Sequence, residues 1–83
     1  MPVVESIKRV LRDTLQLGDR VKQFNESTGL FGSIPEFDSM AVVTIVAALE
    51  EQFDIAIDDD DISADVFETL GSLTRFVEGK LAA

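Results

Sequence analysis

Apolar residues recur at spacings of three and four in three stretches of the chain, and this pattern predicts three main helices. The stretches are residues 3–16, 39–53 and 70–82. A shorter pattern at 64–68 predicts one further turn of helix that buries Val66 and Phe67. We therefore expect an all-α fold, with three main helices and one short helix, in a single domain over residues 1–83.

Turn-forming residues indicate where the first helix begins and ends. Pro2 suits a position in the first turn, and Gly18 suits the exit. Residues 18–37 form a connection too long to lack structure, so we expect a short turn near Asp19–Phe24 with Asp19 as its cap. Four apolar side chains of this connection are expected to hold it on the core: Phe24, Leu30, Phe31 and Ile34.

The second predicted helix is apolar on almost every side, and its residues separate onto two faces. The face expected to join the core holds Val42, Ile45, Val46, Leu49 and Phe53. The opposite face holds Met40, Val43 and Ala47 and continues to Glu50 and Glu51. This second face is either a further part of the core or an exposed ridge on which a partner protein docks.

Composition narrows the possible functions. With 46% hydrophobic and 28% charged residues, the chain has the composition of a folded globule. It contains no Cys and no His, which excludes disulfides, Ser-His or Cys-His catalysis and the common zinc sites. The net charge of −9 argues against nucleic-acid binding, because the sequence indicates no basic stripe suited to a phosphate backbone.

The charge is also unevenly distributed. Residues 1–35 carry five basic and four acidic side chains, whereas residues 36–83 carry two and twelve, a net charge of −10. Such a field attracts basic partner surfaces. No stretch is long and apolar enough to insert into a membrane, and charged residues occupy the N-terminal segment where a signal peptide needs an apolar one. We therefore expect a cytoplasmic protein.

Four consecutive aspartates, Asp58–Asp61, raise the question of a calcium site. A calcium-binding loop that begins at Asp58 would need an oxygen ligand, a glycine and a glutamate where the chain has Ile62, Ser63 and Thr69. A loop that begins at Asp54 fails as well. We predict no dedicated metal site, and loose binding of divalent cations to this run stays open.

Ser39 stands at the predicted start of the second helix. No His can take its proton and no Lys is close in sequence, so nucleophilic catalysis by Ser39 is not expected. A helix N-terminus does offer free N–H groups and a positive dipole end, which suits a phosphate ester on that hydroxyl. Asp38 or Ser39 can also serve simply as the helix cap, and the dipeptide alone does not distinguish these roles.

The wider pattern resembles the acyl carrier protein family over essentially the whole chain. The resemblance lies in Asp38-Ser39-Met40, in Leu49-Glu50-Glu51-Gln52-Phe53-Asp54, and in Phe67-Glu68-Thr69-Leu70-Gly71 with Phe76-Val77. It implies a four-helix bundle in which Ser39 carries a covalent 4′-phosphopantetheine and Asp38 is the adjacent motif residue. It also implies that acyl groups are carried as thioesters on this arm and that the chain itself is not an enzyme.

The same resemblance implies three kinds of partner in lipid or polyketide-like biosynthesis. They are a phosphopantetheinyl transferase, an acyl-loading ligase or acyltransferase, and an acyl-consuming enzyme, all served by a monomeric carrier. The stretch Leu30–Phe53 is further similar to carrier proteins associated with bacterial exosortase and exopolysaccharide gene clusters. The alternative from another class is a small acidic helical adaptor that binds a protein partner without any cofactor.

Departures from the family pattern concern the second helix and its approach. Met40 replaces the usual Leu, which conserves volume, and Phe37 replaces a smaller aliphatic residue. Ala41, Val42 and Thr44 stand where fatty-acid carriers often have charged or polar residues, although Glu50 and Glu51 match the family's acidic pair. We therefore expect the ridge of Met40, Val43 and Ala47 to contribute more to partner recognition than charge does.

Overall fold

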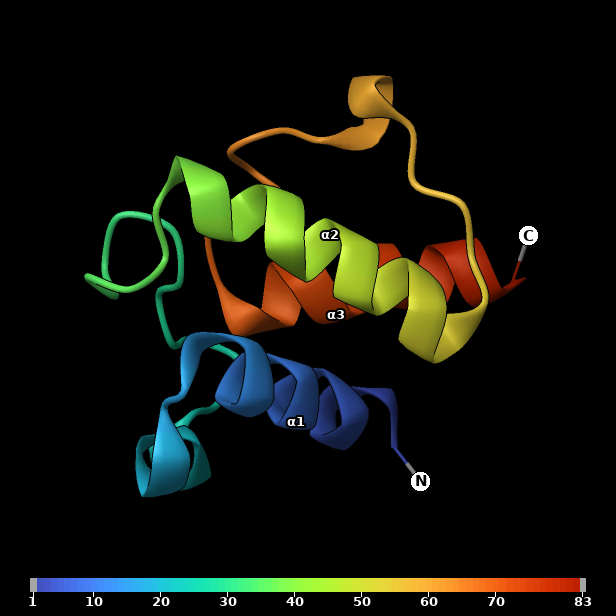
Figure 1. The fold of residues 1–83 in the computed structure, drawn as a ribbon. Helices are drawn as coiled ribbons and strands as arrows, with labels where there is room; N and C mark the ends of the chain where they lie inside the picture. The colour runs from blue at the N-terminus through green and yellow to red at the C-terminus, as the bar shows by residue number, and fades with distance from the viewer. Residues whose placement is uncertain (1, 83) are drawn as a thin grey trace.

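Three α-helices and two short 3-10 helices surround one apolar core (Figure 1). In chain order they are α1 (Val3–Leu15), η1 (Gly18–Gln23), α2 (Ser39–Phe53), η2 (Asp59–Asp61) and α3 (Leu70–Ala82). This computed structural model describes residues 2–82. Those residues contain no strand, only an isolated bridge between Gly29 and Thr69, so the predicted all-α class with three main helices is confirmed.

Helix α1 turns one stripe of its surface to the core. Ile7, Val10 and Leu11 are buried because their spacing of three and four residues places them on the same face. The helix ends at Leu15, and Gln16 takes the left-handed conformation (φ 55°) that closes it. The predicted exit at Gly18 was therefore wrong, and Pro2 is the N-cap residue instead of a residue of the first turn.

The long connection is structured in the way its apolar residues require. The expected turn is η1, but the residue at its N-cap is Leu17 without a side-chain bond, so the predicted capping by Asp19 was wrong. Leu30 and Ile34 are buried and Phe24 is half-buried, as expected. Phe31 is 41% exposed, so the expectation that it holds the connection on the core was wrong; Phe37, which was not assigned to the core, is only 2% exposed and lies edge to face with Phe31.

Helix α2 contributes the centre of the core. Ile45, Val46 and Leu49 are buried as predicted, and burial of each such side chain stabilises the fold by about 1.5–3 kcal/mol. Val42 and Phe53 are only half-buried at the edge of this face, where they still pack against the core. Ala41 is also buried, which the division into two faces did not predict.

The short fourth helix lies earlier in the chain than predicted. Residues 64–67 form turns and not a helix, whereas Asp59–Asp61 form η2. The reason is local hydrogen bonding: the Asp61 carboxylate accepts from the Asp58 N–H at 3.1 Å, and the Asp61 N–H donates to the Asp58 carbonyl at 2.9 Å, which closes a 3-10 turn at the aspartates. Val66 is half-buried and Phe67 is buried, as expected.

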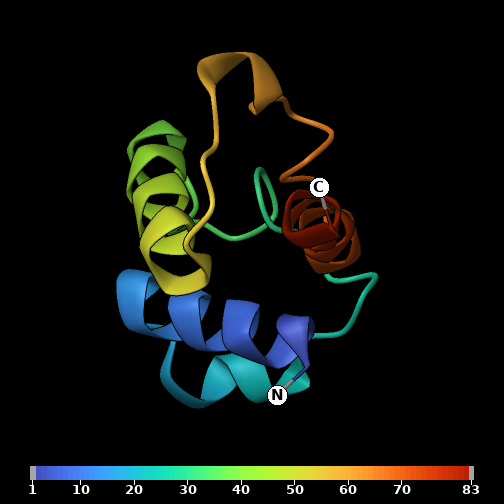
Figure 2. The same cartoon turned by 90° about the vertical axis from the view of Figure 1, so that its right-hand side faces the viewer.

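The start of α3 is joined to the long connection by backbone hydrogen bonds. The Leu30 N–H donates to the Glu68 carbonyl and the Phe31 N–H to the Phe67 carbonyl, both at 2.9 Å. Thr69 and Ser72 cap the helix reciprocally, each hydroxyl accepting from the other's backbone N–H at 3.1 Å. These contacts place two segments distant in the sequence side by side, next to the N-terminus of α2 (Figures 1 and 2).

The predicted apolar face of α3 is confirmed along most of its length. Leu70, Leu73 and Val77 are fully buried, and Phe76 is half-buried. Leu81, near the end of the helix, is 44% exposed and lies outside the core.

Candidate functional site

Asp38 and Ser39 form the N-terminus of α2. The Asp38 carboxylate accepts a hydrogen bond from the Ala41 N–H at 2.9 Å, and its own backbone is extended, so Asp38 is the N-cap. Ser39 is the first helical residue and its side chain is exposed. Because Asp38 performs the capping, the Ser39 hydroxyl is left for other chemistry.

The same helix end provides a favourable place for an anion. The N–H groups of the first turn lack partners within the helix, and the macrodipole adds partial positive charge there. No acidic residue lies in the first turn of α2 itself. An ester phosphate on the Ser39 hydroxyl would therefore meet N–H donors and the positive end of the dipole.

An apolar groove opens directly beside Ser39. Its volume is about 270 Å³, and it is lined by Phe31, Ser39, Val42, Ile62, Ser63, Ala64 and Phe67. The lining comes from three segments: the first turns of α2, the long connection at Phe31, and the chain between η2 and α3. This groove could accommodate an apolar chain attached near Ser39.

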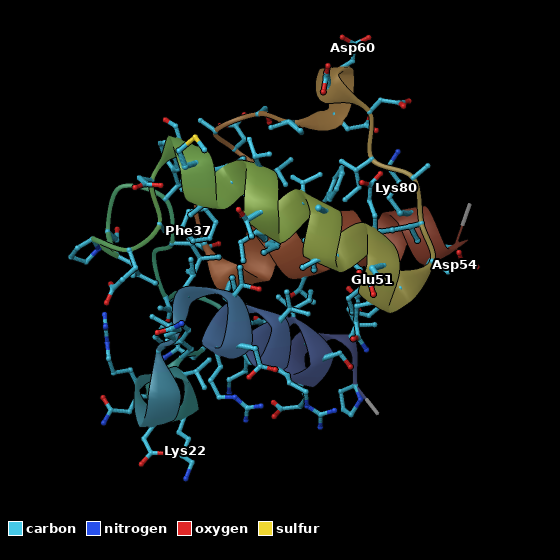
Figure 3. All side chains as sticks on the ribbon, in the orientation of Figure 1. Lys22, Phe37, Glu51, Asp54, Asp60 and Lys80 are labelled. Atoms are coloured by element: carbon cyan, nitrogen blue, oxygen red, sulfur yellow. The ribbon has the colours of Figure 1, made fainter. Side chains whose placement is uncertain are left out.

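Three phenylalanines support the groove. The Phe31 and Phe37 rings stand edge to face with centroids 6.2 Å apart, and the Phe37 and Phe67 centroids are 5.9 Å apart. Figure 3 labels Phe37 near the start of α2. Sequence reasoning did not assign Phe31, Phe37, Ile62 or Ala64 to the site. The sequence does show three Phe residues close to Ser39 or to the acidic loop. That their rings pack together, however, depends on tertiary contacts.

The structure brings the three predicted ridge residues to one exposed face of α2. Met40 is 75% and Val43 65% exposed, and Ala47 is exposed as well. Glu51 is exposed further along the helix (Figure 3), whereas Glu50 is half-buried and its carboxylate accepts the Ile57 N–H at 2.8 Å. Glu50 therefore has a structural task at the exit from α2 that the sequence did not indicate.

The acidic loop is tied to α3 by one ion pair. Lys80 Nζ lies 2.6 Å from Asp61 Oδ2 and 5.8 Å from the centre of the Phe76 ring. The hydrogen bond from Lys80, helped by one from the Asp58 N–H, lowers the pKa of Asp61 below its ordinary value. Residues 2–82 contain no cluster of three or more acidic side chains arranged to hold a metal ion.

Comparison with known proteins agrees with this geometry. Residues 5–77 match the family described as phosphopantetheine attachment site. Curated acyl carrier proteins from Sulfurovum sp. and Wolinella succinogenes are 35% and 33% identical to this chain over 79 residues. The matched residues are 94% of this chain in both cases, and they are 97% of the Sulfurovum protein and 96% of the Wolinella protein. The solution structure of a holo acyl carrier protein from Nitrosomonas europaea matches with a TM-score of 0.92 and 53% identity, with complete coverage of both chains. None of the described helices is long and apolar enough to cross a membrane.

Proposed function

Because the chain belongs to the acyl carrier protein family, we propose that Ser39 is the residue that bears its phosphopantetheine arm. The function of this family is to carry acyl groups on a covalently attached phosphopantetheine, and the chain shares it. The observation that supports Ser39 is its position: an exposed hydroxyl at the first residue of α2, free of the capping role that Asp38 performs.

The residues around Ser39 fit such an arm. The first-turn N–H groups of α2 would receive the phosphate, and the groove between Phe31, Val42 and Ile62 would receive apolar groups beyond it. When attached, the arm supplies the thiol on which acyl groups are carried as thioesters, a group that this chain, which contains no Cys, cannot provide itself. Asp38 caps the first turn of α2, which leaves the Ser39 hydroxyl exposed to an approaching enzyme.

Family members are carriers that act with partner enzymes in acyl transfer. We propose that this chain catalyses no reaction itself and meets the three partners that the sequence predicts: a phosphopantetheinyl transferase, an acyl-loading ligase or acyltransferase, and an acyl-consuming enzyme. The exposed apolar ridge of Met40, Val43 and Ala47, with Glu51 beyond it, is the surface we propose for their docking. The cytoplasmic and monomeric states stay predictions.

Attachment at Ser39 is tested by intact-protein mass spectrometry after incubation with a phosphopantetheinyl transferase and coenzyme A. We expect the native chain to gain the mass of one arm and the Ser39→Ala variant to gain nothing. Ser63→Ala is the matched control, because Ser63 lines the same groove but does not stand at a helix N-terminus, and it should be modified normally. Modification of Ser39→Ala would refute the assignment.

A further inference from the structure

A basic hollow lies between α1 and η1. Side chains at positions 5, 8, 9 and 12 share one stripe of α1, and they face Val21 and Lys22 of η1 across a hollow of about 280 Å³. Four of the six lining side chains are cations, Lys8, Arg9, Arg12 and Lys22, in a chain that has only seven Lys and Arg in total. This clustering of basic side chains is unexpected in a chain whose net charge is −9.

Much of the hydrogen-bonding capacity of the two arginines is free, whereas Lys8 pairs at 3.7 Å with Glu5, which also lines the hollow. Among the described residues, Arg9 takes part in no ion pair, and Arg12 uses only its Nε–H, which donates to Asp13 at 3.0 Å. Lys22 pairs with Asp19 at 3.4 Å on the open surface, where such pairs are weak. Two guanidinium groups one turn apart on α1 can each bind a carboxylate through two parallel hydrogen bonds.

The hollow and the acyl-carrying site face different sides of the molecule. In both views of the ribbon, η1 lies on one side of α1, whereas α2, α3 and η2 lie on the other (Figures 1 and 2). In Figure 3, Lys22 of η1 and Asp60 of η2 accordingly lie at opposite ends of the molecule. A partner bound in the hollow would therefore leave the Ser39 hydroxyl and its groove accessible.

We propose that this hollow is a second docking surface, which holds a carboxylate-rich segment of a protein partner. The cations that line the hollow favour carboxylate groups. The acidic remainder of the chain limits how large an acidic partner can be. Residues 36–83 carry a net charge of −10 and would repel an extended polyanion, such as a nucleic acid or an anionic membrane, that reached past α1. A compact acidic segment avoids that repulsion.

A titration of the ¹⁵N-labelled chain with a short synthetic poly-glutamate peptide at low salt tests the proposal by NMR. We expect amide shifts confined to α1 and η1, which weaken as salt shortens the range of the attraction. Arg9→Glu should reduce the affinity about tenfold or more, because it opposes a carboxylate with a carboxylate. Arg9→Lys, which keeps the charge but loses the two parallel hydrogen bonds, should bind with an affinity between those of the native chain and Arg9→Glu.

The matched control is Arg75→Glu, which makes the same charge change at an exposed site on α3 outside the hollow, and its effect should be much smaller. Ser39→Ala should bind the peptide as the native chain does, so this test is independent of the attachment site. Three results would overturn the proposal: no shifts at low salt, equal shifts with inorganic phosphate, or the same shifts on concentrating the chain alone, which would indicate a second copy in the hollow.

Discussion

Asp38 and Ser39 are neighbours in the sequence, but their side chains have different tasks. The Asp38 carboxylate bonds the Ala41 N–H and the Ser39 hydroxyl is exposed. The sequence allowed either residue to be the cap, because both residue types serve well in that position. Only the backbone conformation, extended at Asp38 and helical from Ser39 onward, distinguishes them.

This division of tasks predicts that two alanine substitutions differ in their effect on stability. Asp38→Ala should lower the free energy of unfolding by about 1 kcal/mol, because it removes the N-cap. Ser39→Ala should change it by about 0.5 kcal/mol or less, as expected at an exposed site. Urea denaturation followed by circular dichroism measures both, and a larger loss for Ser39→Ala than for Asp38→Ala would contradict the assignment of the cap.

Glu50 and Glu51 are a second pair of neighbouring residues whose different roles the sequence did not reveal. In the sequence they are an equivalent acidic pair, and both were assigned to partner docking. The fold turns the Glu50 carboxylate to the Ile57 N–H and leaves Glu51 exposed. Docking through either residue stays a prediction, but a Glu50 variant would also alter the loop after α2, so Glu51 is the cleaner residue to test.

At the scale of elements, α3 contains two glycines in contrasting surroundings. A Cβ atom on Gly71 would lie 2.9 Å from the Glu26 carbonyl oxygen, because the Gly71 N–H donates to that same carbonyl at 3.0 Å. A Cβ atom on Gly79 would have no neighbour within 4 Å. The first glycine allows the long connection to approach the start of α3, whereas the second only weakens the helix.

Alanine substitutions should therefore act in opposite directions within one helix. Gly71→Ala should destabilise the fold by about 1–3 kcal/mol, since backbone atoms must move to admit the methyl group. Gly79→Ala should stabilise it by about 0.5 kcal/mol, because alanine has less conformational freedom to lose. Thermal unfolding compares the two variants, and stabilisation by Gly71→Ala would show that the contact with Glu26 is not close.

Helix α2 combines a buried face with the exposed ridge of Met40, Val43 and Ala47. We expect Val43→Asp to impair transfer of the arm or of acyl groups by partner enzymes while changing stability by about 0.5 kcal/mol or less, since Val43 is 65% exposed. Transfer rates and melting temperatures measure the two effects. Ala56→Asp adds the same charge at an exposed site outside α2 and should leave transfer unchanged. Equal transfer rates for both variants would disprove docking on the ridge.

At the scale of the whole molecule, the Asp61–Lys80 pair joins the acidic loop to α3. The pKa of Asp61 is lowered in the fold. The pair therefore stabilises the fold at pH values above the ordinary pKa of an Asp carboxyl, and this contribution is lost as the pH falls through the pKa of Asp61 in the folded state. Asp61→Asn should thus lower the melting temperature at pH 7, and the difference from the native chain should shrink with acidification. Asp60→Asn, an exposed neighbour, is the control; a difference independent of pH would contradict the account.

The parts of this molecule that were predictable from the sequence depend on residues close together in the chain. The apolar faces of the helices follow from spacings of three and four, and the start of α2 follows from Asp38 and Ser39, because helical geometry and capping act within one or two turns. The family pattern around Ser39 is likewise a local signal. Such features could be predicted without knowing how the helices pack.

Tertiary structure decided the features built from segments far apart. The groove beside Ser39 exists because Leu30 and Phe31 bond to the chain at Phe67 and Glu68, and Phe37 is buried because those segments meet. The basic hollow likewise requires η1 to fold back on α1. Spacing along the chain does not encode which distant segments come into contact, since that choice depends on the packing of the whole core.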